Sequence, residues 1–159
     1  MDQSIETRLA RLEAIEACRA LKMKYARLCD SRYPPVELSE LFVEDGVWDG
    51  GPKWGKHVGR AAIQEFFRVA ESTISWAMHY TVSGDIKVAD DLKSAVGRWY
   101  LWQPMTTEVE GKKKPVILIA DYLDHYVKGP KGQWLYKSLE LHVQILTTLE
   151  DGWVKKPMI

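Results

Sequence analysis

His79 and Asp30 are the two side chains of this sequence whose types could perform acid–base chemistry together. His79 lies in the alternating stretch SWAMHYTVSG, and Asp30 lies where a helical apolar pattern ends. A carboxylate that accepts the Nδ1 proton of a histidine fixes its tautomer and stabilises the imidazolium, so that Nε2 becomes a base near neutral pH. A structural core histidine and a solvated aspartate are the competing interpretations, and the two residues alone do not decide between them.

Tyr25 is the third candidate, because it lies on the inward stripe of the helix that ends at Asp30. Its phenol could donate a hydrogen bond inside a pocket. Apolar residues on this stripe recur at steps of three or four, which predicts one amphipathic helix over residues 4–30. Pro34 and Pro35, which follow it, end the helical pattern.

The remaining elements must bring these groups together. A short helix over 35–42, a short strand around Trp48 in a Gly-rich loop and a helix over 59–73 follow the first helix. From residue 75 the apolar period changes to two, which predicts strands over 76–89, 94–104, 115–128 and 133–147. Helices followed by an antiparallel meander predict a single α+β domain over residues 1–159, in which a curved antiparallel sheet wraps around N-terminal helices. A pocket would then lie between the sheet and the first helix.

The composition argues against several classes of function. Lys and Arg total 22, as do Asp and Glu, and this balance does not favour nucleic acid as a partner. No apolar run reaches the roughly 20 residues of a membrane span and no secretory pattern is present, so we expect a cytoplasmic protein without a membrane partner. Cys18 and Cys29 lie about 16 Å apart on one helix, too far for a disulfide. No spacing matches a metal site, and seven Trp and seven Tyr suit a pocket for a flat organic ligand.

Four segments carry a resemblance in their order along the chain: IEACRALKMKYARLCDSR, MHYTVSGDIKV, AVGRWYLWQ and ADYLDHYVKGPKGQWLYKSLEL. Together they resemble the SnoaL-like branch of the NTF2-like superfamily over nearly the whole chain. The members with the nearest pattern are bile-acid 7α-dehydratase, scytalone dehydratase and hexachlorocyclohexane dehydrochlorinase. The resemblance implies that His79 is the general base and that Asp30 orients it. It further implies that Tyr25 polarises a substrate oxygen and that Trp48 lines the pocket.

Two positions depart from the pattern of these relatives. Gln103 stands where the bile-acid dehydratase has a carboxylate, and a glutamine can orient a hydroxyl or carbonyl group but cannot act as an acid. Leu139 or Val143 stands where relatives carry an inward arginine on the last strand. We therefore expect a pocket that lacks this cation and is more apolar than in those relatives.

Strand alternation extends this assignment to neighbouring positions. The inner face, and with it the substrate pocket, is predicted to comprise Trp99, Leu101, Gln103, Ala120, Tyr122, Leu139, Leu141 and Val143. Arg98, Tyr100 and Trp102 then face outward, as does His142, and such an outer face favours contact with another subunit. His57 lies in a Lys-rich loop, where we expect it to be solvated.

The residues and the resemblance together predict a cofactor-independent lyase of the dehydratase type. Its substrate would be a small apolar ring compound, aromatic, polyketide-like or steroid-like, that bears hydroxyl or keto groups. An isomerase or a retro-aldol carbon–carbon lyase in the same pocket is one alternative, and a non-catalytic small-molecule-binding protein is another. The resemblance also implies a homo-oligomer, with a trimer favoured over a dimer.

Overall fold

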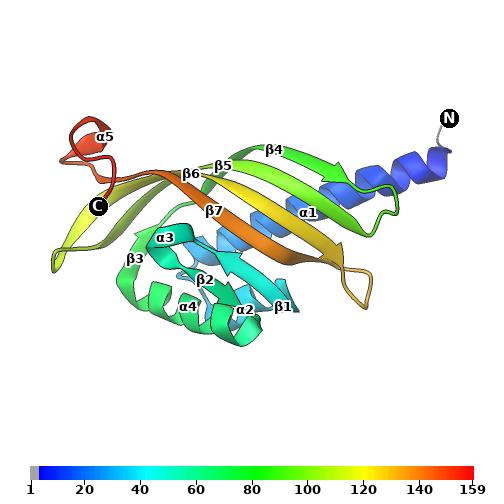
Figure 1. Cartoon of the computed structure of the whole chain (residues 1–159), viewed down its shortest axis with the longest axis horizontal. Helices are drawn as coiled ribbons and strands as arrows, with labels where there is room; N and C mark the ends of the chain where they lie inside the picture. Colours follow the sequence, from blue (N-terminus) through cyan, green and yellow to red (C-terminus); the bar gives the residue numbers. More distant parts are fainter. Residues whose placement is uncertain (1–3) are drawn as a thin grey trace.

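The computed structural model describes residues 4–159, in which a long curved sheet lies along one long helix, α1 (Ile5–Asp30) (Figure 1). Ser4 caps α1, because its hydroxyl accepts a hydrogen bond from the backbone N–H of Thr7. The buried residues of α1 follow the apolar steps of three and four. The predicted helix over residues 4–30 is therefore confirmed.

The short elements that follow α1 differ in part from the prediction. They are α2 (Pro35–Ser39), β1 (Phe42–Asp49), α3 (Gly51–Trp54), β2 (Lys56–Val58) and α4 (Arg60–Thr73). The helix predicted over 35–42 ends at Ser39, because the chain enters β1 three residues later. The strand around Trp48 is longer than predicted, since β1 pairs with β2 and also with β7 (Trp134–Thr148). The helix predicted over 59–73 is confirmed as α4.

The remaining elements are β3 (Ile74–Ala77), β4 (Tyr80–Val88), β5 (Ser94–Val109), β6 (Lys112–Lys128), β7 and α5 (Gly152–Lys155). The strand order is β2-β1-β7-β6-β5-β3, and β4 also pairs with β5. The pairs from β3 to β7 are antiparallel, as the predicted meander requires, whereas β1 lies parallel to β7. β5 and β6 extend beyond their predicted ends, because Glu110 and Gly111, both with positive φ, form a tight turn between them. This curled sheet with N-terminal helices confirms the predicted α+β fold class (Figure 1).

The strand predicted over 76–89 is wrong in one respect, because the structure divides it into β3 and β4 at Met78 and His79. The Asp30 carboxylate accepts a hydrogen bond from the His79 backbone N–H at 2.8 Å. This N–H group is thereby satisfied outside the strand ladder. The predicted alternation persists across the break, since Ala77 is buried and Met78 is exposed.

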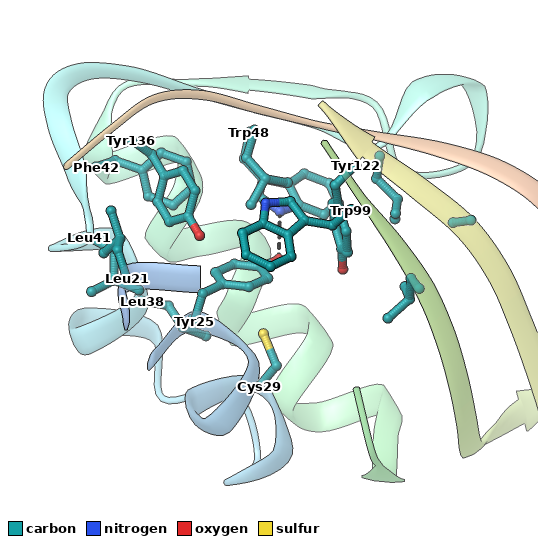
Figure 2. Packing of buried hydrophobic residues seen from close by; sticks show 14 of the residues in the cluster. Leu21, Tyr25, Cys29, Leu38, Leu41, Phe42, Trp48, Trp99, Tyr122 and Tyr136 are labelled. Carbon is teal, nitrogen blue, oxygen red and sulfur yellow. Dashed lines mark hydrogen bonds between the residues drawn. The ribbon is translucent and has the colours of Figure 1, made fainter. Parts of the chain in front are cut away.

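The inner face of the sheet and one face of α1 form an aromatic core. Figure 2 shows Tyr25, Trp48, Trp99 and Tyr122 converging in this core. Tyr25 packs edge-on against Tyr122 and Tyr136, with ring centroids 6.4 and 5.9 Å apart. This packing holds the last turns of α1 against the sheet, where the predicted catalytic groups lie.

The outer face of β3, β4 and β5, together with the break between β3 and β4, carries large apolar side chains that are exposed: Trp76, Met78, Tyr80, Val82, Tyr100 and Trp102. In the ladder between β4 and β5, Tyr80 lies opposite Trp102, and Val82 lies opposite Tyr100. Arg98 is also exposed, as alternation predicts. We refer to the six apolar side chains as the outer apolar face.

Candidate active site

A cavity of about 420 Å³ lies between the inner face of the sheet and the helices α1 and α4. Six of the predicted site residues line it: Tyr25, Trp48, His79, Gln103, Tyr122 and Leu141. Aromatic and apolar side chains that the sequence analysis did not assign to the pocket also line it, among them Tyr33, Trp54, Phe66, Phe67 and Met105. The cavity therefore has the size and the mainly apolar wall of sites for small organic ligands.

His79 and Asp30 form a close pair at the wall of this cavity. Nδ1 of His79 lies 2.7 Å from Oδ1 of Asp30, and the same oxygen accepts the His79 backbone N–H. The side chain of His79 is 5% exposed and that of Asp30 is 28% exposed, and only His79 lines the cavity. Because an ionised carboxylate only accepts hydrogen bonds, Nδ1 carries the proton and Nε2 remains as the acceptor available to a ligand.

Burial lowers the pKa of His79 below its ordinary value of 6.5, while the hydrogen bond and the negative charge of Asp30 act in the opposite direction. The Asp30 carboxylate alone would raise the pKa of His79. The loss of solvation has the larger effect, so the pKa is lowered overall. The imidazole is therefore neutral at pH 7 and able to accept a proton at Nε2. Asp30 stabilises the imidazolium once a proton has been transferred.

The stability of the fold should depend on pH through His79. Because its folded-state pKa is lower than the unfolded-state value of about 6.5, the folded protein binds fewer protons between the two values. Above about pH 6.5, His79 is neutral in both the folded and the unfolded state, and the full stability of the fold is retained. As the pH falls from there through the folded-state pKa of His79, the unfolded chain binds the extra proton more readily, so the free energy of unfolding decreases. Urea unfolding of the wild type and of His79→Gln between about pH 7.5 and about pH 5 measures this dependence. The wild type should lose stability relative to the variant in acid, and a constant difference would contradict a lowered pKa.

Tyr25 and Trp48 meet at another part of the wall, where Trp48 Nε1 donates a hydrogen bond to Tyr25 Oη at 3.0 Å (Figure 2). Tyr25 accepts this bond and keeps its own proton for donation. Burial raises the pKa of Tyr25 well above its ordinary value, so the phenol stays neutral. Phe66 stacks on Trp48 at a centroid separation of 4.0 Å and supports the indole.

Tyr33 and Gln103 form a polar contact beside His79. Gln103 Nε2 lies 3.4 Å from Tyr33 Oη, and the Tyr33 ring lies edge-on to the imidazole at 5.9 Å. Tyr33 is not predicted from the sequence, because it follows α1 in an irregular segment with a positive φ of 55°. Apolar periodicity carries no signal for such a position.

Five residues predicted to line the pocket are not part of the cavity wall: Trp99, Leu101, Ala120, Leu139 and Val143. Alternation places the first four on the buried face correctly, but there the sheet packs into the core and leaves no space for a ligand. Trp99 donates a hydrogen bond to Tyr126 Oη at 3.1 Å and covers Gly84, where a Cβ would lie 2.3 Å from the indole. Val143 is half-buried beside an irregular step in the pairing of β6 and β7.

The prediction that His57 is solvated is wrong, because its ring is half-buried. Its Nε2 lies 2.9 Å from the carbonyl oxygen of Trp54, and its ring lies 4.5 Å from that of Phe66. The pairing of β2 with β1 causes this placement, since it sets His57 opposite Trp48. His142, by contrast, is exposed, as alternation predicts.

A buried ion pair, which the sequence analysis also missed, lies close to the cavity. Lys22 Nζ lies 3.0 Å from Asp124 Oδ2, and both side chains are completely buried. The hydroxyl of Tyr126 donates to the same Oδ2 at 2.7 Å. A lysine in an amphipathic helix usually indicates a solvated face, and its partner here lies 102 residues further along the chain.

The family model for the SnoaL-like domain matches residues 10–140. This chain belongs to the SnoaL-like family. No curated protein is significantly similar to it in sequence. The predicted membership of the SnoaL-like branch is thereby confirmed.

Several solved structures share the fold of this chain. A candidate scytalone dehydratase from Novosphingobium aromaticivorans DSM 12444 is 27% identical, with a TM-score of 0.73 over 91% of each chain. A hexachlorocyclohexane dehydrochlorinase, LinA-type3 from Novosphingobium barchaimii LL02, is 20% identical, with a TM-score of 0.77 over 89% of this chain and 93% of its own. A candidate aromatic ring hydroxylase from Novosphingobium aromaticivorans is 22% identical, with a TM-score of 0.77 over 88% of this chain and 96% of its own.

Residues 4–159 offer neither a membrane-spanning helix nor a cluster of metal-ligating side chains. No helix there is long and apolar enough to cross a membrane. The same residues contain no group of three or more His, Cys, Asp and Glu side chains arranged to hold a metal ion. Cys18 and Cys29 are buried and unpaired, and burial raises the pKa of Cys18 to about 12, so it is a thiol at neutral pH.

Proposed function

We infer that this SnoaL-like protein is a lyase of the dehydratase type that acts on a small apolar ring compound. One observation carries the proposal: a buried imidazole, held at Nδ1 by a carboxylate, keeps Nε2 free at the wall of a mainly apolar cavity. Passive binding of an apolar ligand does not require such a pair. Relatives described as a candidate scytalone dehydratase and a hexachlorocyclohexane dehydrochlorinase support the reaction class.

In the proposed reaction, His79 Nε2 removes a proton from a carbon next to a carbonyl group. Tyr25 and Tyr122 donate hydrogen bonds to the carbonyl oxygen, where negative charge develops. The imidazolium, stabilised by Asp30, then returns the proton to a leaving hydroxyl group, so that the C–O bond breaks, a C=C bond forms and water departs. Acid–base catalysis of this kind contributes roughly 10²–10⁴-fold, and the apolar cavity adds positioning of the substrate. Because the proton is returned, the cycle needs no cofactor.

The cavity restricts the class of substrate. Its aromatic wall suits a flat or fused ring, either aromatic, polyketide-like or steroid-like, and its volume falls in the range of roughly 300–1,000 Å³ that is usual for organic ligands. Gln103 cannot act as an acid, so it is assigned to orient a hydroxyl or keto group of the substrate. The substrate should therefore carry both an acidic C–H and a hydroxyl group within reach of His79.

Incubation of the protein with a panel of cyclic β-hydroxy ketones tests this function. We expect loss of one water from a substrate of the panel, detected by mass spectrometry, and growth of the absorbance of a conjugated enone. A product of unchanged mass that keeps its ring would replace the dehydratase by an isomerase, and a ring-opened product of the same mass with a new aldehyde group would replace it by a retro-aldol lyase. Saturable binding of the panel with no turnover would favour a non-catalytic binding protein.

The proposal includes a homo-oligomer, with a trimer favoured, in which the outer apolar face contacts another copy of this chain. This face comprises six large apolar side chains, five on β3, β4 and β5 and one in the break between β3 and β4, and contiguous exposed apolar surface is typical of protein interfaces. The formal net charge is zero, so copies of the chain have little long-range repulsion.

Tyr100→Glu should dissociate this oligomer, because it places a charge at a side chain that is 63% exposed in the single chain and would be desolvated in the assembly. Sedimentation velocity should show a trimer for the wild type and a monomer for this variant. Lys131→Glu, in the exposed turn after β6, is the matched control and should remain a trimer. A monomeric wild type, or an unchanged Tyr100→Glu assembly, would remove this part of the proposal.

A further inference from the structure

Lys22 places a positive charge close to the cavity that the proposed reaction does not use. Its side chain is completely buried on α1, one turn before Tyr25. Nζ lies 3.0 Å from Asp124 Oδ2 and 3.3 Å from Oδ1, and the hydroxyl of Tyr126 also donates to this carboxylate. Because a buried ion pair adds little stability compared with well-packed apolar residues, stability alone does not account for it.

Tyr122 connects this charge to the cavity. Lys22 Nζ lies 3.3 Å from the centroid of the Tyr122 ring and 5.3 Å from that of Tyr25. The first distance is a direct contact of the ammonium group with the ring face, a cation–π interaction. Tyr122 lines the cavity whereas Lys22 does not, so the ring links the buried charge to a bound ligand.

We propose that Lys22 is a positioning residue that acts through Tyr122: its ammonium group holds the ring and strengthens the Tyr122 hydroxyl as a donor to an oxyanion in the cavity. The ligands favoured by the site are then compounds that carry or develop negative charge on an oxygen, such as enolates of cyclic ketones and phenolates. Leu139 and Val143 on β7 are apolar and supply no positive charge to the site. Lys22 supplies one from α1 instead. The inference rests on the proposed function for its catalytic meaning, but its test does not require turnover.

Asp124 opposes the effect of Lys22 on Tyr122, because its negative charge disfavours an anion nearby. The ammonium group is in contact with the ring, and electrostatic interactions fall with distance. The cation therefore dominates at the ring face. If the charge of Asp124 dominated instead, removal of both charges would strengthen the binding of an anionic ligand rather than weaken it, so the experiment below distinguishes the two cases.

The experiment compares the wild type with the double variant Lys22→Met, Asp124→Asn. This variant removes both charges, while the asparagine amide oxygen still accepts the hydroxyl of Tyr126. Nitrobenzene and 4-nitrophenolate are matched probes, because they share a ring and differ by the oxyanion. We expect the wild type to bind 4-nitrophenolate more tightly than nitrobenzene in absorbance titrations. The double variant should lose roughly 3- to 30-fold in affinity for 4-nitrophenolate, the range of a desolvated cation–π contact, and keep its affinity for nitrobenzene.

The Tyr122→Phe background shows whether the effect passes through the hydroxyl of Tyr122. There the double substitution should change the affinity for 4-nitrophenolate less than about twofold, because coupled residues are not additive. Lys22→Gln, which can still donate to Asp124, provides the same comparison if the double variant does not fold. An equal loss for both probes, an unchanged or increased affinity for 4-nitrophenolate, or a loss that persists in Tyr122→Phe would overturn the inference. The expected pattern without any dehydration would remove only the proposed function.

Discussion

Replacement of His79 by alanine should lower kcat for the dehydration by roughly 10²–10⁴-fold, the usual contribution of a general acid–base group. Nε2 of His79 is assigned both proton transfers, and within residues 4–159 no other imidazole lines the cavity. KM should change less, because apolar and aromatic side chains other than His79 form most of the cavity wall. Steady-state kinetics on the identified substrate measure both constants. His142→Ala, on the exposed face of β7, is the matched control and should retain full activity.

Asp30→Asn keeps the shape of the side chain beside His79 but removes its negative charge. The negative charge of Asp30 is one of the causes that raise the pKa of His79, so its removal should lower this pKa further. The acid limb of the kcat/KM profile should then move to lower pH, while the maximum rate falls because the imidazolium loses its stabilising partner. A wild-type pH profile in this variant, or full activity of His79→Ala, would contradict the catalytic pair.

The elements that the sequence predicts well are those whose burial repeats along the chain. Apolar residues repeat every three or four positions in α1 and every second position in β5, β6 and β7. This spacing shows which side chains face the core, so the bounds of α1 and the inner faces of the strands can be predicted from it. His79 and Asp30 also follow such local spacing, because His79 continues the inward alternation across the break between β3 and β4 and Asp30 is the last residue of α1. Their proximity was inferred from fold resemblance, and the structure places them in contact.

The parts that the sequence did not predict depend on contacts between distant segments. Alternation cannot distinguish an inward side chain that faces a cavity, such as Tyr122, from one that packs into the core, such as Trp99. That distinction is made by the curvature of the sheet and by the close approach of Gly84 to the indole. Tyr33 lies in an irregular segment, where side-chain direction follows from backbone angles that the sequence pattern does not reveal.

Lys22→Met alone should destabilise the fold by about 3–5 kcal/mol, the usual cost of removing one partner of a buried ion pair. The reason is that the Asp124 carboxylate would remain completely buried without its cation. For a chain of this length the melting temperature should fall by roughly 6–20 °C. Urea and thermal unfolding followed by circular dichroism measure the loss. The double variant Lys22→Met, Asp124→Asn should recover most of it, because no buried charge remains.

The pH dependence of Lys22→Met identifies the cause of this loss. Burial raises the pKa of Asp124, and the positive charge of Lys22 is the largest influence that lowers it. Without Lys22 this pKa rises further, so the folded variant binds a proton that the unfolded chain does not bind at the same pH. The variant should therefore regain stability relative to the wild type as the pH falls toward about 5, and lose it again as the pH rises. A single variant as stable as the wild type at pH 7, or a double variant as unstable as the single one, would contradict a charged, mutually stabilised pair behind Tyr122.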